Sequence, residues 1–204
     1  YKQWNKLKAY VNSLGIRMIG DIPIYVAMDS ADAWANPSLF QLDEKNVPYA
    51  VAGCPPDGFS ATGQLWGNPL YRWEYHRQTG YEWWLKRLSH CFKLYDAVRI
   101  DHFRGFDQYY SIPYGAEDAT RGHWEQGPGI DLFNRVRQVL GEKEVIAEDL
   151  GYVTDSVRKL VYDSGFPGMK VLEFAFDSRD SGCANDYLPH NYPENSVAYT
   201  GTHD

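Results

Sequence analysis

The run Ala97-Val98-Arg99-Ile100-Asp101 is short, mostly apolar and ends in an acidic residue. Two later runs share this form: Val145-Ile146-Ala147-Glu148, and the stretch from Val197 to His203-Asp204 at the end of the chain. A carboxylate at the end of a buried strand is costly unless something uses it. Such runs in succession predict a parallel sheet that delivers acidic side chains to one edge, which is where barrel enzymes keep their chemistry.

Helical and extended patterns alternate on both sides of this run. Apolar periodicity predicts helices over 2–14, 81–95, 130–140 and about 154–163, with Gly15, Gly141 and Gly165 as stops and Thr154 as an N-cap. Strands are predicted over 17–24, 97–101, 144–148, 169–176 and 196–202. Alternation of this kind favours an α/β fold with a parallel sheet and right-handed crossovers. Because a complete (β/α)8 barrel needs about 250 residues, a chain of 204 residues can hold the middle of one.

The stretch 27–80 interrupts this alternation. It is rich in Pro, Gly, Asn and Asp, and we expect it to be a long irregular stretch. Connections above about 15 residues in a compact domain are usually functional loops or lids.

Composition excludes some function classes. The net charge is −7 and no basic run is present, which argues against a nucleic-acid surface. No apolar run approaches the roughly 18 residues of a membrane span. The cysteines, Cys54, Cys91 and Cys183, form no CxxC pair, so we expect a reducing, cytoplasmic location and no metal or cofactor. Aromatic residues make up 16% of the chain, which fits either a large core or a groove for flat, polar ligands whose apolar faces stack on the rings.

The acidic runs suggest a division of chemical roles. Arg99 and Asp101 share one face of a strand, and a guanidinium beside Asp101 favours its ionised form, which suits a nucleophile. Glu148 follows an apolar strand, and an apolar setting raises a carboxyl pKa, which suits a general acid/base. Cleavage of a glycosidic bond requires one carboxylate of each kind. Spacing alone leaves a second interpretation open, in which these acids form buried salt bridges at strand ends.

Other polar and aromatic side chains are open to two interpretations: Asp21, Gln64, Trp66, Asp177, His203 and Asp204. Each could face a ligand, or could serve in a turn, a cap or an ordinary loop.

Six stretches together resemble a known family. They are Gly20 to Val26, Pro55 to Ser60, Gly63 to Tyr71, Val98 to Gly105, Ile146 to Gly151 and Gly201 to Asp204. In this order, over nearly the whole chain, they are similar to the 4-α-glucanotransferases of glycoside hydrolase family 77, the amylomaltases or disproportionating enzymes.

The resemblance implies strands three to seven of a TIM (β/α)8 barrel, within a partial catalytic domain over 1–204 and with the insertion 27–80 after strand three. It implies Asp101 as nucleophile, Glu148 as acid/base and Asp204 as the acid that stabilises the transition state. Substrate-binding roles are implied for Arg99, His203, Trp66, Gln64, Asp21 and Asp177. The implied substrates are α-1,4-glucans such as maltooligosaccharides, glycogen or starch, with no cofactor or metal.

Two alternatives to the transferase stay open. An α-amylase-type retaining hydrolase uses similar acids on the same strands, and a glucan-binding fragment that is inactive in isolation needs only the groove. Because the chain starts at Tyr1 and stops at Asp204 directly after a predicted strand, we expect it to be part of a longer protein and to be inactive alone.

Overall fold

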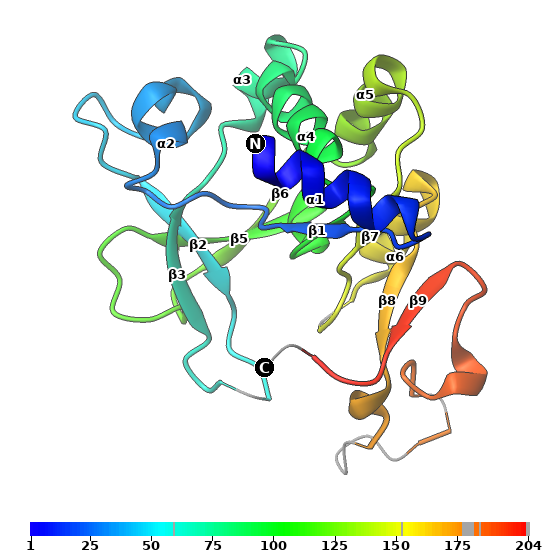
Figure 1. Cartoon of the computed structure of the whole chain (residues 1–204). Coiled ribbons are helices and arrows are strands. Elements are labelled where there is room, and N and C mark those ends of the chain that lie inside the picture. The colour runs from blue at the N-terminus through cyan, green and yellow to red at the C-terminus, as the bar shows by residue number, and fades with distance from the viewer. Residues whose placement is uncertain (59, 152, 177–181, 184, 203–204) are drawn as a thin grey trace. The chain divides into compact units, whose positions relative to one another are not determined.

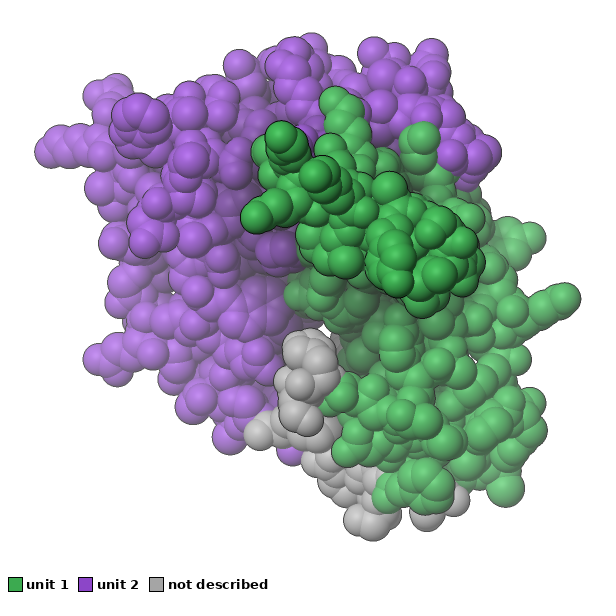
Figure 2. Space-filling model, viewed as in Figure 1, with its two compact units in different colours: residues 1–22, 91–103, 143–204 green, residues 23–90, 104–142 purple. Residues whose placement is uncertain are grey.

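The computed structural model describes residues 1–58, 60–151, 153–176, 182–183 and 185–202 (Figure 1). The chain divides into two compact units (Figure 2). The first contains residues 1–22, 91–103 and 143–204, and the second contains residues 23–90 and 104–142. Helix α4 (Glu82–Leu94) and the 3-10 helix η2 (Phe103–Phe106) pass from one unit to the other along the chain. Each unit is described by itself.

A five-stranded parallel sheet forms the centre of the first unit. Its strands are β1 (Ile19–Ile22), β4 (Ala97–Ile100), β7 (Val145–Ala147), β8 (Gly168–Val171) and β9 (Ser196–Tyr199), side by side in chain order. The unit also holds helices α1 (Lys2–Ser13) and α6 (Asp155–Ser164). The predicted α/β fold with a parallel sheet is therefore confirmed.

The helix termini follow the predicted signals. The Thr154 hydroxyl accepts the backbone N–H of Val157, which caps the first turn of α6, and Gly165 ends that helix in the left-handed region with φ 71°. Gly141 ends helix α5 (Ile130–Leu140) with φ 74°. A side chain at either glycine would be strained, which explains why these helices stop at these points.

The strand predicted over 169–176 is wrong in its second half. The residues after Val171 form the 3-10 helix η3 (Leu172–Phe176) instead. The register with the neighbouring strand β9 ends at the pair Val171 and Tyr199, and one further backbone bond follows, from the Glu173 N–H to the Thr200 carbonyl at 3.1 Å. Phe174 turns its ring edge-to-face onto Tyr187 at a centroid distance of 5.2 Å. A second 3-10 helix, η4 (Pro189–Asn191), also lies between β8 and β9.

The second unit carries an antiparallel sheet that the sequence analysis did not predict. Its strands lie in the order β3-β2-β5-β6, namely β3 (Gln64–Pro69), β2 (Ala50–Cys54), β5 (Gln108–Pro113) and β6 (His123–Gln126). Helices α2 (Ala31–Ala35) and α3 (Trp73–Gln78) and the 3-10 helix η1 (Pro37–Leu39) belong to the same unit. The expectation of an irregular stretch over 27–80 is therefore wrong, because that stretch forms two strands and three short helices.

Aromatic rings fill the interior of this second unit. Trp84 and Phe106 are fully buried and meet edge-to-face at 5.2 Å, and Phe106 meets Phe133 in the same way at 5.1 Å. Tyr71 packs against Trp84 at 5.5 Å and donates its hydroxyl to the carbonyl of Ile24 at 2.7 Å. For these rings the core interpretation of the high aromatic content is correct, since edge-to-face pairs add to the energy of burial.

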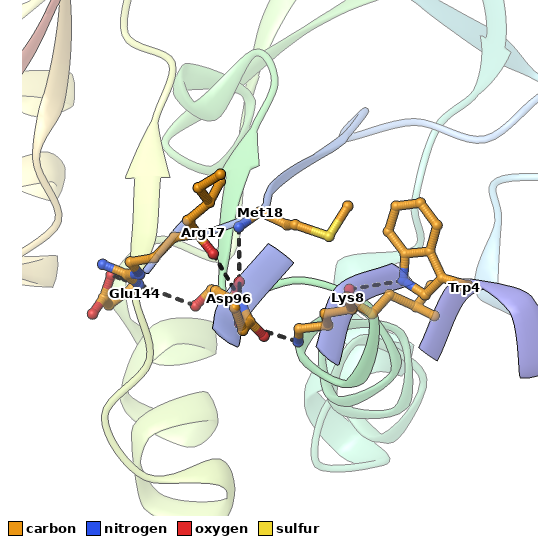
Figure 3. A network of polar contacts seen from close by, with 9 residues as sticks. Trp4, Lys8, Arg17, Met18, Asp96 and Glu144 are labelled. Atoms are coloured by element: carbon orange, nitrogen blue, oxygen red, sulfur yellow. Dashed lines mark hydrogen bonds and ion pairs between the residues drawn. The ribbon is translucent and has the colours of Figure 1, made fainter. Parts of the chain in front are cut away.

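A polar network secures the amino-terminal ends of the strands in the first unit (Figure 3). The Asp96 carboxylate accepts the backbone N–H of Met18 at 2.7 Å and the Asn12 amide at 2.8 Å, and pairs with Lys8 Nζ at 3.2 Å. These hydrogen bonds lower the pKa of Asp96 to about 2. The network ties α1 to the approaches of β1 and β4, although the apolar side chains of Leu7 on the helix and of Leu14 at its C-cap stay exposed.

Across the residues that the structure describes, we find no helix with both the length and the hydropathy that a membrane crossing requires.

Candidate active site at the carboxyl ends of the parallel strands

The register of the parallel sheet brings the predicted acids of the first unit to one edge. Asp21 of β1 lies opposite Arg99 of β4, and Arg99 lies opposite Ile146 of β7. Asp101 and Glu148 follow directly after the last residues of β4 and β7. Because the carboxyl ends of parallel strands meet at the same edge, residues far apart in sequence become neighbours.

Arg99 holds two of these carboxylates. Its guanidinium donates from Nη1 to Asp21 Oδ2 at 2.7 Å and from Nη2 to Asp101 Oδ1 at 2.8 Å. The Arg99 side chain is only 15% exposed, whereas those of Asp21 and Asp101 are 57% and 45% exposed. The largely buried guanidinium of Arg99 therefore orients the carboxylate of Asp101 and leaves it accessible to a ligand.

Glu148 occupies a more enclosed position. Its Oε2 accepts the backbone N–H of His102 at 2.6 Å, and its Oε1 accepts that of Leu150 at 2.9 Å. Burial raises the pKa of Glu148 above its ordinary value, although these two N–H groups favour the ionised form and oppose the shift. The predicted direction for this carboxyl is confirmed. A carboxyl group that keeps its proton to higher pH is suited to donate it to a leaving group.

The turn after β4 delivers the N–H that Glu148 accepts. His102 has φ 51°, in the left-handed region that a residue with a side chain rarely adopts. The next residue, Phe103, donates its N–H to the Glu148 carbonyl at 2.9 Å. The backbone N–H groups of His102 and Phe103 thus join the turn after β4 to the end of β7. The strained backbone of His102 therefore lies next to the acidic residues of the candidate site.

Two predicted substrate-binding residues lie in the second unit, on β3. The Trp66 indole donates from Nε1 to Gln64 Oε1 at 2.9 Å, as expected for alternate residues on one face of a strand. Trp66 is 36% exposed and its ring lies 6.2 Å from that of Tyr25. The Trp66 indole and the Gln64 amide therefore form a hydrogen-bonded pair of exposed side chains.

Three predicted site residues, Asp177, His203 and Asp204, lie outside the described residues.

Two contacts at this edge were not predicted from the sequence. The Asp149 carboxylate accepts the backbone N–H of Met169 at 2.8 Å, and the thioether sulfur of Met169 accepts from Arg99 Nε at 3.2 Å. Asp149 lies in the stretch Ile146 to Gly151 that carries the family resemblance, and its position beside Glu148 was the available signal. Nothing in the sequence pattern indicates a contact between a thioether and a guanidinium.

Comparison with known proteins decides the family. The family profile described as 4-alpha-glucanotransferase, of glycoside hydrolase family 77, matches residues 1–204. The chain belongs to this family. Over 205 residues it is 53% identical to a 4-alpha-glucanotransferase of Clostridium butyricum, and the match covers 100% of the chain and 42% of that relative. Over 204 residues it is 55% identical to one of Streptococcus pneumoniae, with 100% and 40% covered.

A solved structure of a family 77 protein shares the fold. The amylomaltase of Streptococcus agalactiae, determined in complex with acarbose, is 48% identical and superimposes with a TM-score of 0.96. The match covers 100% of this chain and 41% of that structure. The family 77 chain described here therefore spans about two fifths of the length of the relatives that it matches.

Proposed function

We propose that this chain forms the catalytic centre of a 4-α-glucanotransferase, which transfers segments of α-1,4-glucans to the 4-hydroxyl of an acceptor glucan or glucose. The observation that carries the proposal is the pair of unlike carboxyl groups at one edge of the sheet. Arg99 holds Asp101 at 2.8 Å, and burial raises the pKa of Glu148. Family membership over the whole chain supports the same reaction class.

The proposed fold is a partial (β/α)8 barrel. Its five parallel strands correspond to strands three to seven, in a catalytic domain over 1–204 with the insertion 27–80 after strand three. The sequential order β1-β4-β7-β8-β9 supports this assignment, because a barrel adds each strand beside the one before it.

The proposed mechanism uses two displacements. Glu148 protonates the glycosidic oxygen while Asp101 attacks the anomeric carbon, which forms a covalent glycosyl-enzyme and releases the shortened glucan. Glu148, now ionised, takes the proton of the acceptor 4-hydroxyl as that oxygen displaces Asp101. Two inversions retain the configuration. In a glucan complex we expect the two carboxyl groups about 5–5.5 Å apart, the spacing of retaining enzymes.

The remaining roles concern the substrate. We propose Asp204 as the third acid, which stabilises the transition state, and we propose that Arg99, Asp21, Gln64, Trp66, Asp177 and His203 bind the glucan. The complex of the Streptococcus agalactiae amylomaltase with acarbose supports α-glucans as the ligand class. A cytoplasmic location stays a prediction.

The test uses the full-length protein that carries this chain, with maltotriose as substrate. A ladder of longer glucans is the expected product, whereas glucose and maltose alone would show an α-amylase-type hydrolase. Asp101→Asn removes the nucleophile and should abolish the ladder. Glu148→Gln removes the general acid and should lower kcat for transfer by about 10²–10⁴-fold. Binding of maltotriose without either product would show a glucan-binding protein and would contradict the proposal.

A further inference from the structure

The backbone ladder between β7 and β8 is short. Within the described residues these strands share the register pair Ala147 and Gly168, and the Ala147 N–H donates to the Pro167 carbonyl at 2.9 Å. The next residue bonds on the other side of β7, where the Glu148 N–H donates to the Ile100 carbonyl of β4 at 3.1 Å. Within the described residues, no register pair joins β7 and β8 beyond Ala147 and Gly168.

The Asp149 side chain adds a contact at this point. Its Oδ1 accepts the Met169 N–H at 2.8 Å, at the start of β8. The carboxylate lies so close to Gly168 that a Cβ there would be 2.7 Å from Oδ2 and 2.9 Å from Oδ1. Burial raises the pKa of Asp149, and the Met169 N–H opposes the shift. A half-buried carboxylate is kept here because it fixes the start of β8.

Met169 carries this fixed position to Arg99. Its side chain is buried, with 7% exposure, and its sulfur accepts from Arg99 Nε at 3.2 Å. The Arg99 guanidinium is then held by three acceptors: the carboxylates of Asp21 and Asp101 and the Met169 sulfur. A planar guanidinium held at three of its nitrogens has little freedom to rotate. The thioether is uncharged, so it fixes the plane without competing with the carboxylates for the positive charge.

We propose that Asp149 and Met169 are positioning residues for Asp101 and act on it through Arg99. The order of contacts is Asp149 carboxylate, Met169 N–H, Met169 sulfur, Arg99 guanidinium, Asp101 carboxylate. The inference rests on the proposed function, in which Asp101 attacks the anomeric carbon. A misplacement of about 1 Å in a reacting group can lower the rate by about 10²-fold, so a lost contact in this series is measurable in kcat.

The deciding variant is Met169→Leu in the full-length protein. Leucine has a similar volume but no acceptor, so the fold is kept while the contact with Arg99 Nε is lost. We expect kcat to fall about 10-fold, with KM within about twofold of wild type. Asp149→Ala should lower kcat further, and Asp149→Asn should recover most of the loss because its amide oxygen can still accept the Met169 N–H.

The choice of donor separates an effect on Asp101 from an effect on Glu148. With α-maltosyl fluoride, fluoride leaves with little protonation, so its release reports the attack of Asp101 rather than the proton from Glu148. Fluoride release should fall in Met169→Leu by the same factor as turnover of maltotriose. The matched control is Asp163→Asn, which removes an exposed carboxylate paired with Lys159 at 2.7 Å on α6 and should leave both rates unchanged.

Several outcomes would overturn the inference. One is an unchanged kcat in Met169→Leu with both donors, and another is a loss with maltotriose alone, which would assign the effect to Glu148. A loss in proportion to a lower unfolding temperature would show a purely structural role. Fluoride release counts hydrolysis as well as transfer, so the positioning inference is tested even if the protein is a hydrolase. If wild type makes no glucan ladder but releases fluoride, only the transferase proposal fails, and if it releases no fluoride, both fail.

Discussion

Stability at acidic pH offers a quantitative test of the packing in the second unit, through His76. This side chain is fully buried on α3, where the rings of Tyr71 and Trp73 lie 5.4 and 5.3 Å away. Its Nε2 donates to the carbonyl of Leu39 at 3.2 Å, since a carbonyl can only accept. Burial lowers the pKa of His76 from 6.5 to about 4, and the bond to Leu39 only partly opposes this.

The sign follows from proton linkage. Above pH 6.5, His76 is neutral in both the folded and the unfolded chain and contributes no pH dependence. Between pH 6.5 and about 4, the unfolded chain binds a proton that the folded chain rejects, so the free energy of unfolding falls as the pH falls. At about 1.4 kcal/mol per pH unit, this interval corresponds to a loss of about 3 kcal/mol by pH 4.

The assay is urea unfolding followed by tryptophan fluorescence at pH 7, 6, 5 and 4. Trp73 and Trp84 belong to the same unit as His76, so the signal reports the relevant packing. His76→Gln keeps an N–H donor for Leu39 but binds no proton, and it should lose about 3 kcal/mol less than wild type between pH 7 and pH 4. Replacing the exposed His190 by Gln should keep the wild-type profile. Parallel profiles for wild type and His76→Gln would refute the reasoning.

Three further predictions concern other regions. Asp96→Asn should lower the unfolding temperature at neutral pH. The difference in unfolding temperature between variant and wild type should shrink as the pH falls from 3.8 toward about 2, because wild-type Asp96 takes up a proton in this interval. A difference that stays constant down to pH 2 would contradict this prediction. Gly20→Ala should destabilise the chain by about 1–3 kcal/mol in urea unfolding, because a Cβ would lie 2.1 Å from Cδ2 of Tyr95, and a smaller loss would mean that the ring moves freely. In the full-length protein, Trp66→Ala should raise the ratio of hydrolysis to transfer if, as proposed, Trp66 binds the glucan and excludes water from it, and an unchanged ratio would exclude that role.

The parallel sheet could be predicted from the sequence because its signals are local. Each strand is a short apolar run, and helices end at residues such as Gly141 and Gly165 whose left-handed backbone a side chain would strain. The antiparallel sheet could not be predicted, because its strands find their partners only in three dimensions. β2 pairs with β3 through a register shift between Val51 and Gly53, and with β5 more than fifty residues later, and no periodic pattern marks such a pairing.

The site was predictable to the extent that it depends on strand ends. Alternation along β4 placed Arg99 and Asp101 on one face, and the structure joins them at 2.8 Å. The contacts that orient this pair were not predictable, since they depend on a strained turn at His102 and on the close approach of Asp149 to Gly168. Both are tertiary features, and a sequence pattern that reports burial does not report which buried groups touch.

An acid at the end of a strand is therefore weak evidence of function by itself, because β4 has one at each end. Asp96, just before the strand, is held by three donors that fix its charge and lower its pKa to about 2, as suits a structural anchor (Figure 3). Asp101, just after it, is held by Arg99 and keeps 45% of its side chain exposed. Glu148 lies at the same end of the sheet as Asp101, and burial raises its pKa. Asp96 and Asp101 therefore differ in the number of hydrogen-bond donors around each carboxylate and in its exposure. The fold sets both properties, so they cannot be read from the presence of an acidic residue at a strand end.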